Sequence, residues 1–346
     1  MSKSISLTEK SQSIFNDTIS KHLVSLEDFR IDKLTDFNKR KSVCKRYAIV
    51  VWLLAFAGCY MLDVTDAIYI ISVIYAIGIG IFITRPLGKY ERRYLKLYRL
   101  NFAPIVFKEL FNFDYLGKKS VYEDLKDFSI LNNFDFCVNE DYLRGSVDSV
   151  KFEFTELRTI FDKANDADKV FKGCAALLTF EDKFKSNITI KSDHWHEQKN
   201  KHAKSKLEKV EINNSEFNKY FTIKSDNTDY AKALINDKII DKLIEYSVDL
   251  HVLFNEEFVN LAPEFKKQID ANKKDGIDDE MATSVLELEV KDNQLLILMR
   301  GQHDFLAPND INTSVYNTSS LAVIEKQINV VRDITNLFKL SMLKNK

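Results

Sequence analysis

The spacing of hydrophobic residues changes along the chain, and the first spacing is helical. Between residues 11 and 40, apolar side chains recur every three or four positions, which predicts an amphipathic helix. The apolar positions are Phe15, Ile19, Leu23, Leu26, Leu34 and Phe37. Packing on its own chain is the simplest interpretation of this helix, because its opposite face carries both signs of charge. Packing on a partner helix or on a membrane surface is the alternative.

Two apolar runs without charged residues follow at 47–62 and 67–84, and only the short segment 63–66 separates them. About 20 apolar residues are needed to span a bilayer, so the runs predict two antiparallel transmembrane helices. Lysine and arginine flank the pair on both sides and are missing from the loop, which places both flanks in the cytoplasm. We therefore expect a multi-pass protein of the cytoplasmic (inner) membrane, with cytoplasmic N- and C-termini and the lipid bilayer as a partner.

Helical spacing returns after the second run and continues to about residue 112. Aromatic residues at 90, 94, 98 and 102 form one stripe, and Pro104 is expected to kink or restart the helix. Basic residues between 89 and 99 lie next to the predicted inner leaflet, where lysine and arginine attract anionic lipid. This attraction motivates one functional alternative, an anionic-lipid-sensing domain.

From residue 113 the pattern becomes short runs with alternating apolar positions, which predict β-strands. The runs read SVKFEFTEL, CAALLTFED, SNITIKSD, KVEI, YFTIKS, VLELEV and LLILMR. Asp292 and Asn293 predict a hairpin turn between the last two runs. Helical spacing at 229–248 and 320–340 adds two amphipathic helices. The predicted fold class is therefore α+β with a mainly antiparallel sheet, preceded by a two-helix transmembrane hairpin.

These elements divide the chain into four parts. They are a cytosolic amphipathic N-terminal helix at 1–46, the transmembrane hairpin at 47–84, a juxtamembrane helix at 85–112 and a cytosolic α+β domain at 113–346. Within the hairpin, Ala76 and Gly80 allow close contact between helix backbones. We expect a protein partner or a homo-oligomer contact through the hairpin or the cytosolic domain, with packing inside the hairpin as the simpler interpretation of the small residues.

Composition narrows the function classes. Lysine and arginine (50) balance aspartate and glutamate (51), so no global field favours nucleic acid, and no nucleic-acid partner is expected. The four cysteines form no CxxC pair, which argues against a zinc knuckle or a disulfide framework. No sequence motif for a phosphate-binding loop, a zinc protease or a serine hydrolase is present. We therefore expect no cofactor.

Three of the six histidines, His194, His196 and His202, fall in the segment KSDHWHEQKNKHAK. On a strand, His194 and His196 would share a face, as metal ligands require. Five lysines between 199 and 209 repel a cation, and no apolar residue other than alanine lies between Trp195 and Leu207. A solvated connection between two strands is therefore the favoured interpretation, and a metal site is the weaker one.

Carboxylates near the start of the strand region suggest a second possible site. Glu140, Asp141 and Glu156 could supply a pair for acid–base chemistry if they converge in one pocket. The same residues fit an ordinary turn and strand entry, with Gly145 easing the bend. We expect no catalytic residue here, and the three carboxylates are weak candidates.

The order of segments resembles a bacterial membrane protein family of unknown function, DUF3137. The resemblance rests on FAPIVFKELF, FDFCVNEDYLRGSVDSVKFEFTEL, VFKGCAALLTFEDKF, EFNKYFTIKSDNTDYAKALIND and RGQHDFLAP, which together cover about 102–340. It implies a short hydrophobic hairpin near the N-terminus and a cytosolic α+β domain, and it carries no catalytic motif. Residues 252–284 depart from the pattern as a longer, more polar insertion whose role the sequence leaves open.

These observations favour a membrane-anchored cytosolic binding or scaffold domain that is not obviously catalytic. One alternative is a membrane-tethered hydrolase or nucleotide-dependent enzyme that uses the acidic residues near 140–156. The other is the anionic-lipid-sensing domain.

Overall fold

The structure is a computed structural model, and it describes residues 6–61, 89–131, 134–163, 166–191, 207–261, 286–300 and 312–345. The chain divides into two compact units. One comprises Thr8–Leu110 and Ala307–Ser320, and the other comprises Met1–Leu7, Phe111–Leu306 and Leu321–Lys346.

The first unit begins with nearly continuous helix. Helix α1 covers Glu9–Ile14, the π-helix η1 covers Phe15–Ile19, and α2 covers Ser20–Met61. Thr8 caps the start, because its side-chain oxygen accepts a hydrogen bond from the Ser11 amide at 3.4 Å. The predicted amphipathic helix is confirmed, and its first four apolar positions, Phe15, Ile19, Leu23 and Leu26, are buried.

A second helical stretch packs on α2. Residues 89–97 are helical, the π-helix η2 covers Tyr98–Phe102, and α4 covers Ala103–Phe111. The Tyr90 hydroxyl donates a hydrogen bond to Asp36 at 2.6 Å. The aromatic stripe is buried at Tyr94, Tyr98 and Phe102. Pro104 lies in the first turn of α4, and the helix continues past it: the wide turn of η2 directly precedes the residue that cannot donate a hydrogen bond.

The predicted transmembrane hairpin has no support from the structure. Within the residues that the structure describes, none of the helices combines the length and the apolar composition needed to cross a bilayer. The first predicted span, 47–62, lies in α2 as far as Met61, and the second, 67–84, lies outside the described residues.

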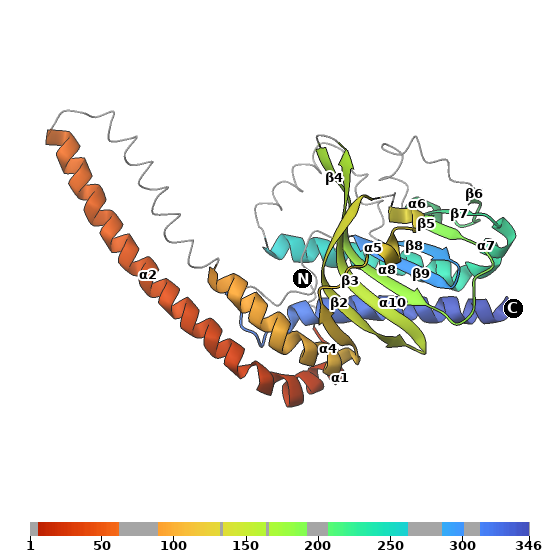
Figure 1. The fold of residues 1–346 in the computed structure, drawn as a ribbon, viewed down its shortest axis with the longest axis horizontal. Helices are drawn as coiled ribbons and strands as arrows, with labels where there is room; N and C mark the ends of the chain where they lie inside the picture. Colours follow the sequence, from red (N-terminus) through yellow and green to blue (C-terminus); the bar gives the residue numbers. More distant parts are fainter. Residues whose placement is uncertain are drawn as a thin grey trace. The chain divides into compact units, whose positions relative to one another are not determined.

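The second unit is built on a nine-stranded antiparallel sheet, with strand order β1-β2-β3-β4-β9-β8-β5-β7-β6 (Figure 1). The α+β fold with a large antiparallel sheet is confirmed. The strands are β1 Asp114–Gly117, β2 Phe136–Val147, β3 Val150–Lys163, β4 Asp166–Thr179, β5 Ile188–Lys191, β6 Glu208–Val210, β7 Thr222–Ser225, β8 Leu286–Lys291 and β9 Gln294–Arg300.

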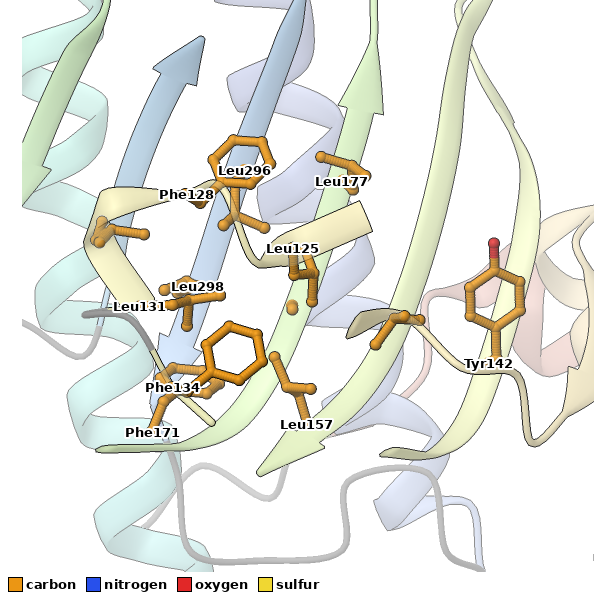
Figure 2. Close-up of a cluster of buried hydrophobic side chains, with 13 residues drawn as sticks. Leu125, Phe128, Leu131, Phe134, Tyr142, Leu157, Phe171, Leu177, Leu296 and Leu298 are labelled. Atoms are coloured by element: carbon orange, nitrogen blue, oxygen red, sulfur yellow. The ribbon is translucent and has the colours of Figure 1, made fainter. Parts of the chain in front are cut away.

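Both faces of the central strands are buried. Figures 1 and 2 show α8 (Asp237–Leu261) and α10 (Ser319–Lys344) behind the sheet and the short helix α5 (Tyr122–Leu125) in front of it. The 3₁₀-helix η3 (Ser129–Leu131) follows α5. Under this α5–η3 segment lies an apolar cluster that includes Leu125, Phe128 and Phe134 together with Leu296 and Leu298 of β9. The face of the sheet that carries Leu296 and Leu298 is called the front face below.

Two elements differ from the sequence prediction. The single helix expected at 229–248 is two helices, α7 (Thr228–Leu234) and α8, because Asn236 ends one and caps the other. Its Oδ1 accepts hydrogen bonds from the amides of Lys238 at 3.1 Å and Ile239 at 3.3 Å. The turn expected near residues 140–145 is instead the middle of the long strand β2, and the chain reverses at Asp148 and Ser149, both with positive φ.

Gly145 lies within β2 for a reason other than a bend. A Cβ atom at this position would lie 2.5 Å from Cδ1 of Phe113, so only glycine fits under the buried phenylalanine ring. By contrast, the predicted hairpin at Asp292 and Asn293 is confirmed. Lys291 pairs with Gln294 across it, and Asp292 takes a positive φ of 52°.

Candidate functional site

Three lysines share the front face at one end of the sheet. Lys224 of β7 lies directly opposite Lys209 of the edge strand β6 and opposite Thr189 of β5. Lys191, two residues beyond Thr189 on β5, points to the same face because side chains alternate along a strand. We call Lys191, Lys209 and Lys224 the basic strip. Lys209 and Lys224 are exposed, and Lys191 is half-buried.

Two glutamates of β8 lie on the same face next to the strip, and both carboxylates already have strong partners. Glu287 is fully buried and accepts hydrogen bonds from Nη2 of Arg300 at 2.8 Å and from Nε at 3.1 Å. The Arg300 guanidinium also lies over the Phe171 ring at 5.2 Å. This ion pair is therefore part of the packed sheet face.

Glu289 fastens the α5–η3 segment to the sheet. Its carboxylate accepts hydrogen bonds from the Ser129 amide at 3.0 Å, the Ser129 hydroxyl at 3.1 Å and the Ile130 amide at 2.6 Å. Lys291 adds a hydrogen bond to the Asp127 carbonyl at 3.0 Å. The buried Glu289 carboxylate thus caps the start of η3, which covers the front face.

Burial shifts the protonation equilibria at this end of the sheet. Desolvation lowers the pKa of Lys191, as do the charges of Lys224 and Arg300, and these effects outweigh the opposing influence of Glu287 and Glu289. Desolvation also raises the pKa of Glu289 and outweighs the hydrogen bonds from Ser129 and Ile130, which lower it. Lys209 and Lys224 face each other directly across β6 and β7, an arrangement that costs stability unless an anion offsets it, and the exposed Glu211 carboxylate lies 3.3 Å from the Lys209 ammonium. The strip can therefore bind carboxylate or phosphate groups.

The predicted carboxylates are brought together by a β-bulge. Asn139 pairs with Leu157 and Tyr142 pairs with Thr155, so Glu140 and Asp141 both lie opposite Glu156. Asp141 is buried and accepts a hydrogen bond from the Tyr115 hydroxyl. The backbone places the three residues side by side, while the Asp141 carboxylate serves to join β1 to β2.

The predicted histidine cluster cannot be compared with the structure. His194, His196 and His202 lie outside the described residues. Across the part of the chain that the structure describes, no group of three or more histidine, cysteine, aspartate or glutamate side chains is arranged to hold a metal ion.

The basic strip was missed in the sequence. The sequence places Lys191 in one predicted strand and Lys209 at the start of another, KVEI, without relating the two. The usable signal was the alternation of polar and apolar residues in KVEI and YFTIKS, which puts Lys209 and Lys224 on the exposed face of each strand. The strand order that joins them is not encoded in that alternation.

Comparison with family models gives a match to part of the chain. The family model described as a protein of unknown function (DUF3137) matches residues 169–270. The predicted resemblance to DUF3137 is confirmed over this stretch. The matched stretch of the DUF3137 model runs from within β4 to beyond the end of α8 and contains all three lysines of the basic strip. Residues 102–168 and 271–340, which also carry the resemblance in the sequence, lie outside it.

Two further comparisons add little. The crystal structure of the mycobacterial trehalose monomycolate transport factor A, TtfA, is similar to the chain with a TM-score of 0.35 and 12% sequence identity. The likeness covers 71% of this chain and 97% of that one, and it is too weak to transfer a function. No curated protein matches the chain.

Proposed function

We propose that this DUF3137 protein is a membrane-anchored binding or scaffold protein whose α+β domain holds an acidic segment of a partner protein at the cytosolic face. The observation that carries the proposal is the direct pairing of Lys209 with Lys224 across the edge of the sheet, with Lys191 on the same face. A carboxylate-rich segment laid along these strands would relieve the repulsion between the lysines.

The bonding of Glu287, Glu289 and Asp141 supports binding more than catalysis. A general acid or base must reach the substrate's proton. The carboxylates of Glu287 and Glu289 are buried and accept hydrogen bonds from Arg300 and from the η3 backbone, respectively. Asp141 accepts a hydrogen bond from the Tyr115 hydroxyl. On strands β5, β6 and β7, the exposed charged side chains of the front face are Lys209 and Lys224, and they suit an anionic partner.

Membrane anchoring rests on the sequence of the segment between Asp36 and Tyr90. From Asp36, α2 continues to Met61, about 38 Å at 1.5 Å per residue. Residues 62–88 then connect Met61 to the helix that contains Tyr90. The sequence places the apolar runs 47–62 and 67–84 between these two helical residues, and each run is close to the length that a membrane span needs. Inner-membrane localisation with both termini in the cytoplasm is part of the proposal.

Binding of a labelled deca-glutamate peptide to the full chain in detergent tests the basic strip. Fluorescence anisotropy compares the protein with a variant carrying Lys191→Gln, Lys209→Gln and Lys224→Gln. If each lysine contributes about 0.5 kcal/mol, the affinity falls roughly tenfold. The affinity of the unchanged protein should also decrease as salt is added, because the contacts are between solvated charges.

A matched control carries Lys183→Gln, Lys232→Gln and Lys238→Gln, three exposed lysines outside the strip with the same change in net charge. This control should bind the peptide like the unchanged protein. Equal weakening in both variants would show that net charge alone attracts the peptide, and the proposal would fail. Strip-dependent binding to phosphatidylserine vesicles without binding to the peptide would favour the lipid-sensing alternative.

A further inference from the structure

The first half of strand β2 forms an open edge of the sheet. Strand β1 pairs with β2 only at Tyr142, Leu143 and Arg144. The bulge at Glu140 and Asp141 interrupts the regular ladder just beyond this point. Residues Phe136–Asn139 pair with β3 on one side and have no strand on the other among the residues that the structure describes. Their outward amide and carbonyl groups are therefore placed to pair with another strand.

This edge is apolar and carries no lysine or proline. Phe136 is 43% exposed and Val138 is 38% exposed, and alternation puts both side chains on the same face. Edge strands are commonly protected by lysine or proline. The segment FDFCVNED, residues 134–141, contains neither. The open edge lies in the half of the sheet that contains β1, away from the basic strip beside β6, so its function goes beyond the proposed binding of an acidic segment.

We propose that a second copy of this chain pairs with the edge Phe136–Asn139, antiparallel to it and about a twofold axis at Cys137. The edge is complementary to itself in this register. Phe136 of each copy lies opposite Val138 of the other, and the two Cys137 residues face each other. Asp135 lies opposite the neutral Asn139. The contact extends the sheet across the two copies and buries the exposed apolar pair.

Neighbouring registers are less favourable. A twofold axis perpendicular to the sheet shifts the register in steps of two residues, since paired residues must share a face. Moving the axis to Val138 puts Phe136 opposite Glu140, which leaves the ring against a carboxylate. Moving it to Phe136 puts Cys137 opposite Asp135 and requires Val138 to meet Phe134, which is buried in the cluster under η3. The axis at Cys137 is the register that pairs apolar with apolar.

Disulfide formation at single cysteines tests both the contact and its register. Directly opposed residues have Cα atoms about 4.5–5.5 Å apart, within disulfide range, whereas diagonal neighbours lie about 7–8 Å apart. The experiment uses the full chain, in its membrane or in detergent, with Cys44→Ser and Cys59→Ser. Cys174 can be kept because it is fully buried. Oxidation with copper phenanthroline above pH 8 should give a covalent dimer that disappears with Cys137→Ser. The alkaline pH is needed because burial raises the pKa of the Cys137 thiol.

The register is checked with two variants that also carry Cys137→Ser. Phe136→Cys and Val138→Cys should form a mixed dimer when combined, at least fivefold more than either forms alone. Val138→Lys in the background that keeps Cys137 should abolish the covalent dimer, and Val138→Thr, which keeps a β-branched side chain, should preserve it.

Several results would overturn the proposal. A chain that stays monomeric under oxidation has no such contact. Equal yields at positions 136, 137 and 138, or a dimer that persists with Val138→Lys, would show random collision. A Cys137 adduct with a different protein in place of the dimer would assign the edge to another occupant.

Discussion

At the scale of single residues, buried polar side chains make large contributions to the free energy of unfolding. Glu287 and Glu289 are buried, and each is held by several hydrogen bonds. Gln327 of α10 is also fully buried, yet neither its amide nitrogen nor its oxygen has a hydrogen-bond partner among the described residues. A buried amide without partners costs about 1–3 kcal/mol, so Gln327 lowers the free energy of unfolding, whereas the hydrogen bonds of the two glutamates raise it.

Replacing Gln327 should therefore stabilise the protein. The change Gln327→Leu keeps a similar volume and removes the unpartnered amide, and we expect the free energy of unfolding to rise by about 1 kcal/mol. Denaturant unfolding of the full chain measures it. Thr335→Val is the control, since the Thr335 hydroxyl donates to the Val331 carbonyl at 2.6 Å and its loss brings no such gain. A less stable Gln327→Leu variant would show that the amide has a favourable partner.

Glu289 should make stability depend on pH. Its pKa in the folded state is raised above the ordinary value of 4.5, so the folded chain holds the proton more tightly than the unfolded chain. The resulting stabilisation is complete below pH 4.5 and is lost as the pH rises through the folded pKa. Relative to the unchanged protein, Glu289→Gln should thus gain stability between pH 4.5 and pH 8. Urea unfolding at several pH values measures the difference, and a difference that stays constant with pH would contradict the assignment.

At the scale of elements, local pattern predicted most of the fold. The strands β3 to β9, the turn at Asp292 and the terminal helix follow from alternation and helical spacing, which local sequence encodes. The break at Asn236 was missed, because apolar spacing continues through it and only the capping side chain marks the end. Strand β2 was missed because Gly145 resembles a turn residue. Its real constraint is contact with Phe113, which is distant in the sequence.

The helix break at Asn236 can be tested by capping chemistry. Asn236→Ala removes the acceptor for the Lys238 and Ile239 amides and the donor to the Ser341 hydroxyl at 3.2 Å. We expect a loss of about 1–2 kcal/mol in the free energy of unfolding. Asn236→Asp keeps the capping oxygen and should lose less than half as much. Equal losses in the two variants would assign the effect to the bond with Ser341 instead of the cap.

At the scale of the whole molecule, the candidate site depends on strand order, which the sequence pattern does not contain. Lys191, Lys209 and Lys224 come from three strands, and they become one surface only because β7 lies between β5 and β6. The carboxylates Glu140, Asp141 and Glu156 lie side by side because the hairpin that joins β2 to β3 is local. Their bonding was not predictable, because the Tyr115 hydroxyl that binds Asp141 comes from β1.

Membrane topology is the remaining prediction at this scale, and it follows from charge. The flanks of 47–84 are rich in lysine and arginine, whereas the loop 63–66 contains two aspartates and no basic residue. A spanning hairpin with cytoplasmic flanks must therefore expose this loop on the opposite side of the membrane. In a chain whose native cysteines are replaced by serine, Thr65→Cys should react in intact cells with a membrane-impermeant maleimide. Ser13→Cys, at an exposed position of α1, should react only after the cells are opened. Labelling of both positions in intact cells, or of neither, would contradict the hairpin, and a chain that alkaline carbonate releases from membranes would contradict anchoring altogether.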